Sequence, residues 1–378
     1  MRKPLSRLVL RLINTDSLTS LFQPLQIGSM TTPNRIFMAP LTRCRAEEEH
    51  QPGDLMVEHY TQRASAGLII AEATMAMEGN SAFYAEPGIY AEAQVAGWKR
   101  VTDSVHQAGG RIFLQIWHGG RACHSSLNGG SQPVGPSALP ITNDEANTPE
   151  GKKPYEIPRV LSDEELPEVI EGFGRAAENA KRAGFDGVEV HGANGYLLDQ
   201  FLRDGSNKRT GKYGGSMENR ARLLLEVVAA VTEVWGPNRV GLRLSPINSF
   251  NSMRDSDPLA LVTWLGGKLC SMNLAYWHVM RSDFLGEQSG DVLAVARLAY
   301  QGILVGNMGY TPEEAALAIK DGQVDAVAFG TTFLANPDLP ARVKAGASLN
   351  SPDQGTFYTP GAKGYTDYPS LTASLGVS

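Results

Sequence analysis

The sequence predicts one α/β domain with the architecture of a (β/α)8 TIM barrel. Short β-branched or apolar runs recur along the 378 residues, and each is followed by a longer stretch with helical spacing. Eight such repeats favour parallel strands that close into a barrel. The length also suits this fold, since such barrels run from roughly 200 to over 400 residues. An open doubly wound sheet is the alternative, but it normally carries a GxGxxG motif after its first strand, and none occurs there.

The alternation gives approximate bounds for each element. Strands are expected at residues 35–42, 68–75, 111–118, 187–193, 240–246, 274–280, 303–309 and 326–332. Helices are expected at residues 54–65, 94–107, 162–182, 216–234, 258–271, 291–300 and 312–320, followed by a short turn near Leu339. The strands are enriched in β-branched residues, whereas the helices carry apolar residues three and four positions apart.

Helix ends carry recognisable signals. Ser162 and Glu165 have the spacing of a capping box, in which each side chain bonds the other residue's backbone. Pro312 lies just inside an expected helix start, where its missing N–H costs nothing. Gly184 and Gly322 lie where helices are expected to stop, because glycine readily adopts the left-handed conformation of a C-terminal cap.

Two segments interrupt the alternation. Residues 21–34 have the pattern of a short hairpin ahead of the first strand, and we expect this hairpin to cover the barrel floor. Residues 119–161 form a long excursion after the third strand, rich in Pro, Gly, Ser and Asn. Long loops inside compact domains are usually functional, and loops that follow barrel strands build the active face.

Composition narrows the class of partner. Lys plus Arg is 34 and Asp plus Glu is 40, so the net charge of 34 − 40 = −6 argues against a nucleic-acid binder. No apolar run approaches eighteen residues, so we expect no membrane partner. Three cysteines without a CxxC pair favour a reducing compartment, and we expect a cytoplasmic protein.

The first twenty residues differ from the rest. They carry four basic residues against the single acid Asp16, with Leu and Ser between them. This pattern is typical of an organelle-import segment, although an N-terminal extension that frays is the simpler alternative. We therefore divide the chain into an extension at 1–20 and a single barrel domain at 21–378.

The fourth expected strand ends in the most reactive set of side chains. Period-two alternation places His191 on the face opposite the neighbouring valines, and Asn194 and Tyr196 follow on a glycine-flanked turn. Imidazole and carboxamide groups both donate hydrogen bonds, so together they suit an oxygen that gains negative charge. A phenol such as Tyr196 is able to supply a proton. A core histidine, a turn asparagine and a packing tyrosine would explain the same residues without any activity.

Other strand ends indicate an anionic, flat ligand. Gly306, Asn307 and Gly330 follow the seventh and eighth strands, where barrels often bind phosphate, although ordinary tight turns are the alternative. Arg243 on the fifth strand is costly to bury without a partner, and the two readings are an ion pair with Glu189 or an anionic ligand. Gln115 and Trp117 share one face of the third strand and suit a heterocycle; core packing explains the tryptophan equally well.

Several common catalytic motifs are absent from the sequence. It has no HExxH, GxSxG or GxxxxGK[ST] motif. His118 and His124 flank Cys123, but this spacing matches no standard ligand set, so we expect no bound metal.

Taken together, the motifs resemble those of the Old Yellow Enzyme family of FMN-dependent ene-reductases. The resemblance runs from about residue 21 to residue 371, and six ordered segments carry it. These are LFQPLQIGSMTTPNRIFMAPLTRCRA (21–46), LQIWHGGR (114–121), FDGVEVHGANGYLLDQFLRDGSNKRTGKYGGSMENRARLLLE (185–226), GLRLSP (241–246), AFGTTFLANPDL (328–339) and FYTPGAKGYTDYP (357–369).

The resemblance implies a role for each candidate residue. His191 and Asn194 would bind the substrate oxygen, Tyr196 would donate the proton, and Trp117 and Tyr358 would line the substrate pocket. The residues implied to hold FMN, which is bound tightly but not covalently, are Pro40, Thr42, Ala73, Gln115, Arg243, Gly306, Asn307, Gly330 and Thr331.

Three of these cofactor residues have more specific implied roles. Thr42 would bond the flavin carbonyl edge and tune its potential, at a position where some relatives carry Cys. Gln115 and Arg243 would bond the pyrimidine side, and Arg243 would stabilise negative charge there.

The chain departs from the family pattern at four places. Thr331 replaces an arginine at the phosphate site, so a full charge is lost and FMN binding is expected to weaken. Gly211 replaces an aspartate in a loop. After the sixth strand, the run that contains Arg281 differs from the run usual in the family. Trp277 replaces the smaller residue that is usual at its position. The sequence does not show whether the last two reshape the pocket.

The function that the resemblance implies is reduction of activated alkenes. NAD(P)H, and NADPH rather than NADH, would reduce FMN, which would pass hydride to the β-carbon of an α,β-unsaturated carbonyl or nitro compound. Tyr196 would then protonate the α-carbon. A flavin- or ligand-binding sensor with little turnover is the alternative, and a sugar-phosphate isomerase leaves the His, Asn and Tyr set unexplained. We expect a monomer or a homodimer.

Overall fold

The computed structural model describes residues 15–371 and confirms the predicted barrel. Eight strands form one closed sheet in the order β10-β11-β12-β13-β14-β3-β4-β5, and every neighbouring pair is parallel. The strands are β3 (Ile36–Met38), β4 (Ile69–Met75), β5 (Ile112–Trp117), β10 (Gly187–Gly192), β11 (Val240–Leu244), β12 (Tyr276–Met280), β13 (Leu304–Asn307) and β14 (Ala326–Phe329).

Helices follow the barrel strands as the alternation predicts. The outer helices are α1 (Asp54–Gln62), α2 (Glu92–Gln107), α3 (Leu166–Arg182), α5 (Met217–Trp235), α6 (Pro258–Cys270), α7 (Val292–Ala299), α8 (Pro312–Lys320) and α10 (Leu339–Ala345). Two short helices follow strands β10 and β14 directly, namely α4 (Leu197–Leu202) and α9 (Thr331–Ala335). These two were not expected, because helices of five or six residues carry almost no periodic signal.

Most of the expected boundary signals are confirmed. Pro312 lies in the first turn of α8 as expected, and Gly184 and Gly322 have φ angles of 84° and 71° after α3 and α8. The expected start of α3 at residue 162 is wrong. Residues 163–165 form a turn, in which the Glu165 carboxylate accepts from the Ser162 amide, and the helix begins at Leu166 with a proline in its first turn.

Six of the eight strands end earlier than predicted, whereas β4 and β12 end at Met75 and Met280 as expected. The expected strand at 326–332 ends at Phe329, and Thr331 already belongs to α9. The residues beyond each strand end leave the sheet to form loops, and their apolar composition alone does not show this.

Alternation along the strands produces two cores. Val188 and Val190 face outward into the layer between barrel and helices, together with Leu242 and Leu244. The inward positions hold a second core at the lower end of the barrel, which includes Phe37, Ile70, Phe113, Tyr276 and Val305. Glu189 and His191 share the inward face, so the predicted orientation of His191 is confirmed.

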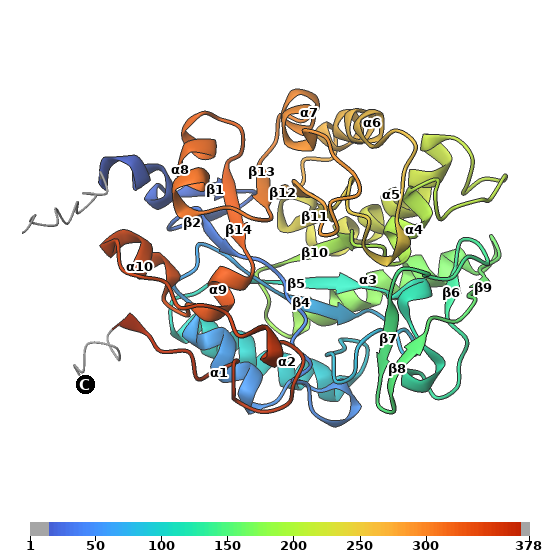
Figure 1. Cartoon of the computed structure of the whole chain (residues 1–378), viewed down its shortest axis with the longest axis horizontal. Helices are drawn as coiled ribbons and strands as arrows, with labels where there is room; N and C mark the ends of the chain where they lie inside the picture. The colour runs from blue at the N-terminus through green and yellow to red at the C-terminus, as the bar shows by residue number, and fades with distance from the viewer. Residues whose placement is uncertain (1–14, 372–378) are drawn as a thin grey trace, which may run out of the picture.

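The expected hairpin at the barrel floor is present as β1 (Leu25–Ile27) and β2 (Met30–Thr32). Leu25, Ile27 and Met30 pack into the inward core, so this hairpin closes one end of the barrel. Figure 1 shows it at the left of the view, at the end from which the barrel strands start. Just before it, the 3₁₀ helix η1 (Thr15–Phe22) crosses our boundary at residue 20 and packs against α8; residues 1–14 lie outside the described residues.

The excursion at 119–161 lies at the opposite end, where the strands finish. It contains the antiparallel hairpin β7 (Glu145–Thr148) and β8 (Gly151–Pro154) and a parallel pair, β6 (Val134–Gly135) with β9 (Arg159–Val160). In Figure 1 these four strands are at the right, beyond the tip of β5. The barrel is therefore covered by a hairpin at one end and by long loops at the other.

A pair of alanine substitutions tests the closure at the floor. Gly28 has φ +52°, and a Cβ there would lie 1.8 Å from the Asn238 carbonyl oxygen. Gly28→Ala should therefore lower the free energy of unfolding by about 2–4 kcal/mol, from left-handed strain and overpacking together. Gly322→Ala is the control, since it has φ +71° but open space, and should lose only about 1 kcal/mol. Equal losses in urea denaturation would contradict a tight contact at the floor.

Candidate functional site

A buried carboxylate organises the polar layer in the barrel interior. Glu189 accepts from Gln115 Nε2 at 2.7 Å through one oxygen and from His278 Nδ1 at 2.8 Å through the other. Burial alone would raise the pKa of Glu189, but His278, Arg243 and Gln115 together hold it below its usual value. Glu189 is therefore ionised, and its negative charge fixes the orientation of Gln115.

Arg243 lies on the neighbouring strand and is not paired with that carboxylate. Its Nη2 donates to Asn307 Oδ1 at 3.0 Å, its Nε has no partner, and among residues 15–371 it forms no ion pair within 4 Å. The alternative of a Glu189–Arg243 ion pair is therefore wrong, because Gln115 and His278 occupy the carboxylate. A buried guanidinium with a free N–H needs an acceptor, and an anionic ligand at the barrel mouth would supply one.

Three aromatic rings meet at the ends of β5 and β10. The Trp117 and Tyr196 centroids lie 4.2 Å apart in an edge-to-face contact, and His191 lies 6.0 Å from Trp117 and 5.2 Å from Tyr196. Burial and the nearby Arg243 charge lower the pKa of His191, so its imidazole is neutral near pH 7. Burial raises the pKa of Tyr196, so its hydroxyl keeps its proton.

Asn194 sits on the turn between β10 and α4. Its φ is +57°, a left-handed conformation that asparagine tolerates better than most residues. Its amide N–H donates to Ser245 Oγ at 2.7 Å, and Gly195 N–H donates to Asp199 Oδ2 at 2.8 Å. The turn is thus held on both sides, and the structure brings His191, Asn194 and Tyr196 to one end of the barrel as predicted.

The segment after β3 is fixed by a second buried carboxylate. Glu72 accepts from the Arg43 amide at 3.1 Å and from the Tyr60 hydroxyl at 3.0 Å, and burial raises its pKa to about 7. Pro40 and Thr42 precede Arg43 in the same segment, and Ala73 follows Glu72 on β4. Residues from two neighbouring strand ends therefore meet at the barrel mouth.

A small cavity of about 140 Å³ opens above this cluster, and Tyr196 and Tyr358 both line it. The Phe83 ring lies between two predicted residues, 6.1 Å from Trp117 and 5.7 Å from Tyr358, so the three rings form a continuous wall. The sequence analysis missed Phe83, because it lies in an irregular loop with no periodic signal.

Tyr358 reaches the cavity from the far end of the chain. Arg45 donates to the carbonyl oxygens of Thr356 and Phe357 at 2.8 Å, and Arg43 donates to Gly364 O at 2.7 Å. These buried guanidinium groups fix the C-terminal segment to the loop after β3, which places Tyr358 at the cavity although half of its surface stays exposed.

The strand ends expected to bind the FMN phosphate are more open than the strand ends expected to bind its ring. Gly306 and Asn307 end β13, and Asn307 Nδ2 donates to Ala328 O on β14 at 2.7 Å. A Cβ at Gly330 would meet only Leu41, at 3.8 Å, so there is space beside this glycine. Thr331 is exposed and supplies no charge there.

Both departures that raised doubt about the pocket lie outside it. Trp277 faces the outer core and packs edge-to-face against Tyr300, with centroids 5.5 Å apart. Arg281 lies over the Tyr310 ring and donates to the carbonyl oxygens of Met308 and Gly309 at 2.8 and 2.9 Å. These contacts brace the loop after β13, and Arg281 also lines a groove beside α7 rather than the barrel mouth.

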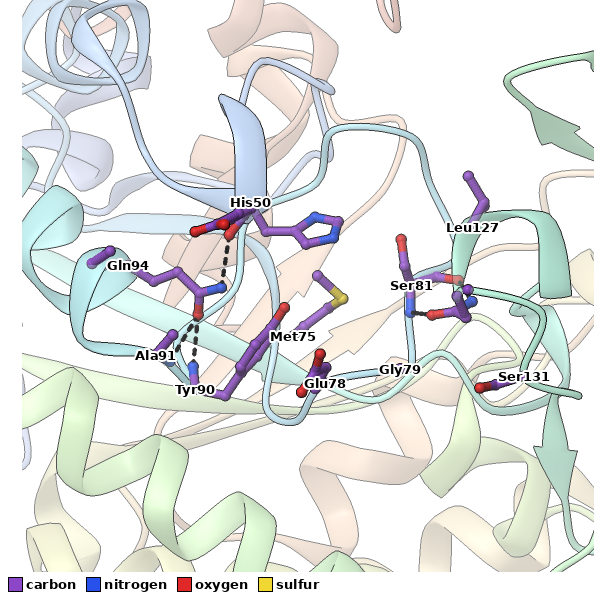
Figure 2. A pocket seen from close by; sticks show the side chains of 14 residues that line it. His50, Met75, Glu78, Gly79, Ser81, Tyr90, Ala91, Gln94, Leu127 and Ser131 are labelled. Atoms are coloured by element: carbon purple, nitrogen blue, oxygen red, sulfur yellow. Dashed lines mark hydrogen bonds between the residues drawn. The ribbon is translucent and has the colours of Figure 1, made fainter.

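A larger cavity, of about 820 Å³, lies among the loops after β3 and β4 and the excursion. Figure 2 shows the side chains that line it. Its polar groups are largely satisfied within the protein. Gln94 accepts from the amides of Tyr90 and Ala91 and donates to Glu49 O, while the Ser81 amide donates to Asn128. None of the predicted site residues lines it, so we assign the chemistry to the smaller cavity above Tyr196.

Comparison with known proteins gives a consistent result. Residues 20–350 match the NADH:flavin oxidoreductase / NADH oxidase family. A Leishmania infantum protein named "Probable flavin mononucleotide-dependent alkene reductase" is 50% identical over 360 residues, covering 94% of this chain and 98% of that protein. Morphinone reductase superposes with a TM-score of 0.90 at 47% identity, covering 94% and 97%. The old yellow enzyme from Trypanosoma cruzi gives 0.90 at 43% identity, covering 94% and 100%.

A buried acid beneath the Phe83 loop makes stability depend on pH. Glu86 accepts from the Ala82 amide, and burial raises its pKa to about 8 from an ordinary 4.5. The folded protein therefore keeps a proton that the unfolded chain releases. Its stabilising effect is complete below about pH 4.5 and is lost as the pH rises through about 8.

Glu86→Gln should remove this dependence. The variant should exceed the wild type in unfolding free energy by about 2–4 kcal/mol at pH 9, and the gap should close towards pH 5. Urea denaturation across this range measures the difference in unfolding free energy between the two proteins. Protonation of the histidines affects both proteins equally, so it does not contribute to this difference. Glu78→Gln, on the exposed part of the same loop, is the control. A gap that stays constant with pH would show that Glu86 is ionised when folded.

Proposed function

The chain belongs to the NADH:flavin oxidoreductase / NADH oxidase family, and from this premise we propose that it is an FMN-dependent ene-reductase of the Old Yellow Enzyme type. The observation that carries the proposal is the set of buried nitrogen atoms without hydrogen-bond partners at the barrel mouth. Trp117 Nε1, His191 Nδ1 and Arg243 Nε are all buried and lack a hydrogen-bond partner.

The side chains present fit the ring of FMN. Gln115, held by Glu189, and Arg243, with its free N–H, would bond the pyrimidine side of the flavin. Pro40, Thr42 and Ala73 would contact the ring from the neighbouring strand ends. The phosphate would lie against Gly306, Asn307, Gly330 and Thr331. The positive charge of Arg243, at the pyrimidine side, would stabilise negative charge on the flavin ring.

FMN supplies hydride chemistry when it is bound, taking hydride from NAD(P)H and delivering it to an activated C=C bond. The protein's own part begins with the substrate oxygen. Neutral His191 and the Asn194 amide would donate hydrogen bonds to a carbonyl or nitro oxygen, which gains negative charge as the C=C bond is reduced. Both hydrogen bonds would strengthen as that charge grows, so they would stabilise the transition state more than the bound substrate.

Tyr196 would then donate the proton. Its hydroxyl has no hydrogen-bond partner among residues 15–371 and borders the small cavity, and burial keeps it protonated. The edge contact with Trp117 and the tilted contact with His191 fix the ring in place. We infer that Tyr196 protonates the α-carbon of the substrate.

Other aspects of the proposal remain predictions. We infer NADPH rather than NADH as the reductant, a monomer or a homodimer, and a cytoplasmic protein. Within residues 15–371, no helix is long and apolar enough to cross a membrane.

The Tyr196→Phe substitution separates the two halves of the proposed reaction. Reduction of 2-cyclohexenone should slow by about 10²-fold or more, since a positioned proton donor contributes that much. Anaerobic reduction of the bound flavin by NADPH should change only a few-fold, because that step needs no proton from Tyr196. Stopped-flow absorbance follows each half-reaction. Equal slowing of both would exclude the proton-donor role, and a wild type without any enone reduction would favour the sensor alternative.

The Thr331→Arg substitution tests the phosphate end. Restoring a full positive charge should tighten FMN binding by about ten-fold at low salt, and the gain should shrink as salt is added. Fluorescence titration of the apoprotein measures the affinity. Riboflavin, which lacks the phosphate, is the control ligand and should bind both proteins equally. An equal gain for riboflavin would place Thr331 away from the phosphate.

A further inference from the structure

Asn194 is held almost completely by one loop. Three side chains of the loop after β11 bond three of its polar groups. Ser245 Oγ accepts from its amide N–H at 2.7 Å, Asn251 Nδ2 donates to its carbonyl at 2.9 Å, and Asn248 Nδ2 donates to its Oδ1 at 3.0 Å. Only the Asn194 Nδ2 group has no partner among the described residues. The loop therefore leaves a single hydrogen-bonding group of Asn194 free, and that group is a donor.

The orientation of the Asn248 amide is itself determined. Its Oδ1 accepts from the backbone amides of Phe284 at 3.2 Å and Phe250 at 3.4 Å. Backbone N–H groups only donate, so the oxygen end of Asn248 must face them and its NH₂ end must face Asn194. Since an NH₂ group needs an acceptor, Asn194 turns its oxygen towards Asn248 and its own NH₂ away.

Asn248 is rigidly placed for this role. It is completely buried, and its backbone carbonyl accepts from Arg203 Nη1 at 2.6 Å. Two charged groups bond this segment, Arg203 at the Asn248 carbonyl and Asp283 at Ser249, and neither bonds the Asn248 side-chain amide. A Cβ at Gly195 would lie 2.6 Å from Asn251, so the loop and the Asn194 turn pack without space between them.

The geometry points to Asn248 as a positioning residue that fixes Asn194 as a hydrogen-bond donor to the substrate oxygen. The inference rests on the proposed function, since it assumes that Asn194 meets that oxygen. With Asn248 absent, the Asn194 amide would be free to rotate and present its own oxygen, which would repel the substrate oxygen. Asn248 thus acts through Asn194 and does not touch the substrate.

Asn248→Asp tests the inference with almost no change in size. An ionised carboxylate accepts at both oxygens, so the Asn194 amide should turn its NH₂ towards it and its oxygen towards the substrate. The FMN-loaded variant should bind 4-hydroxybenzaldehyde, a ligand with an acceptor oxygen, at least 10-fold more weakly. Its kcat/KM for 2-cyclohexenone should fall by about 10²-fold or more, as expected for loss of one oxyanion donor.

The pH profile identifies the cause. A protonated carboxyl donates through its O–H and restores the wild-type orientation, and burial should raise the pKa of the introduced group. The binding defect of Asn248→Asp should therefore shrink as the pH falls. Asn248→Ala, which has no titrating group, should bind more weakly than the wild type at every pH and should not recover. A purely structural defect would show no such recovery.

A double-mutant cycle and a matched control complete the test. In an Asn194→Ala background, Asn248→Asp should have little further effect on binding, because there is no amide left to orient. Gln288→Glu makes the same amide-to-acid change beside this loop, where Gln288 Nε2 bonds the carbonyls of Ile247 and Met253, and should spare ligand binding.

Two results would overturn the inference: wild-type phenol binding in Asn248→Asp, or an equal loss in the Asn194→Ala background. A wild type that binds the phenol but does not reduce the enone would refute the proposed function alone, because the binding comparison would still test Asn248.

Discussion

The buried charges of Glu189 and Arg243 constrain the rest of the site. Each is expensive to remove from water, and each lies on the inner face of the barrel. Glu189 is satisfied by Gln115 and His278 inside the protein, whereas Arg243 has one amide partner and a free N–H. This unequal arrangement leaves a positive, donor-rich surface at the carboxyl ends of the strands. The barrel is thus prepared for a flat anionic ligand at that end.

Loops then build the proposed reaction site on this surface. The turn after β10 carries Asn194 and Tyr196, the loop after β11 holds that turn, and the C-terminal segment contributes Tyr358. Each loop is fixed by buried hydrogen bonds rather than by regular structure, as Arg45 illustrates with its contacts to the Thr356 and Phe357 carbonyls. Rigid loops of this kind hold donors at fixed positions, which favours stabilisation of a developing charge without reorganisation.

Much of the fold was predictable because barrel strands and helices follow simple periodicities. The inward orientation of His191 follows from alternation with Val188 and Val190, and the start of α8 follows from Pro312. Long-range contacts were not predictable. Nothing near Phe83 in the sequence indicates a stack with Trp117 and Tyr358, and the Gln115–Glu189–His278 chain joins three strands far apart in sequence. The start of α3 was misplaced because the Ser162–Glu165 pair also stabilises a turn.

The hairpin β1–β2 has a consequence for how molecules reach the site. Leu25, Ile27 and Met30 seal the floor, so small molecules reach the inner residues only through the loop-covered end. In the proposed reaction, reductant and alkene would therefore both approach the flavin from this end of the barrel. If both use the same face of the ring, each would have to leave before the other binds. A high concentration of one substrate would block the other, so turnover would depend on the ratio of the two as well as on their amounts.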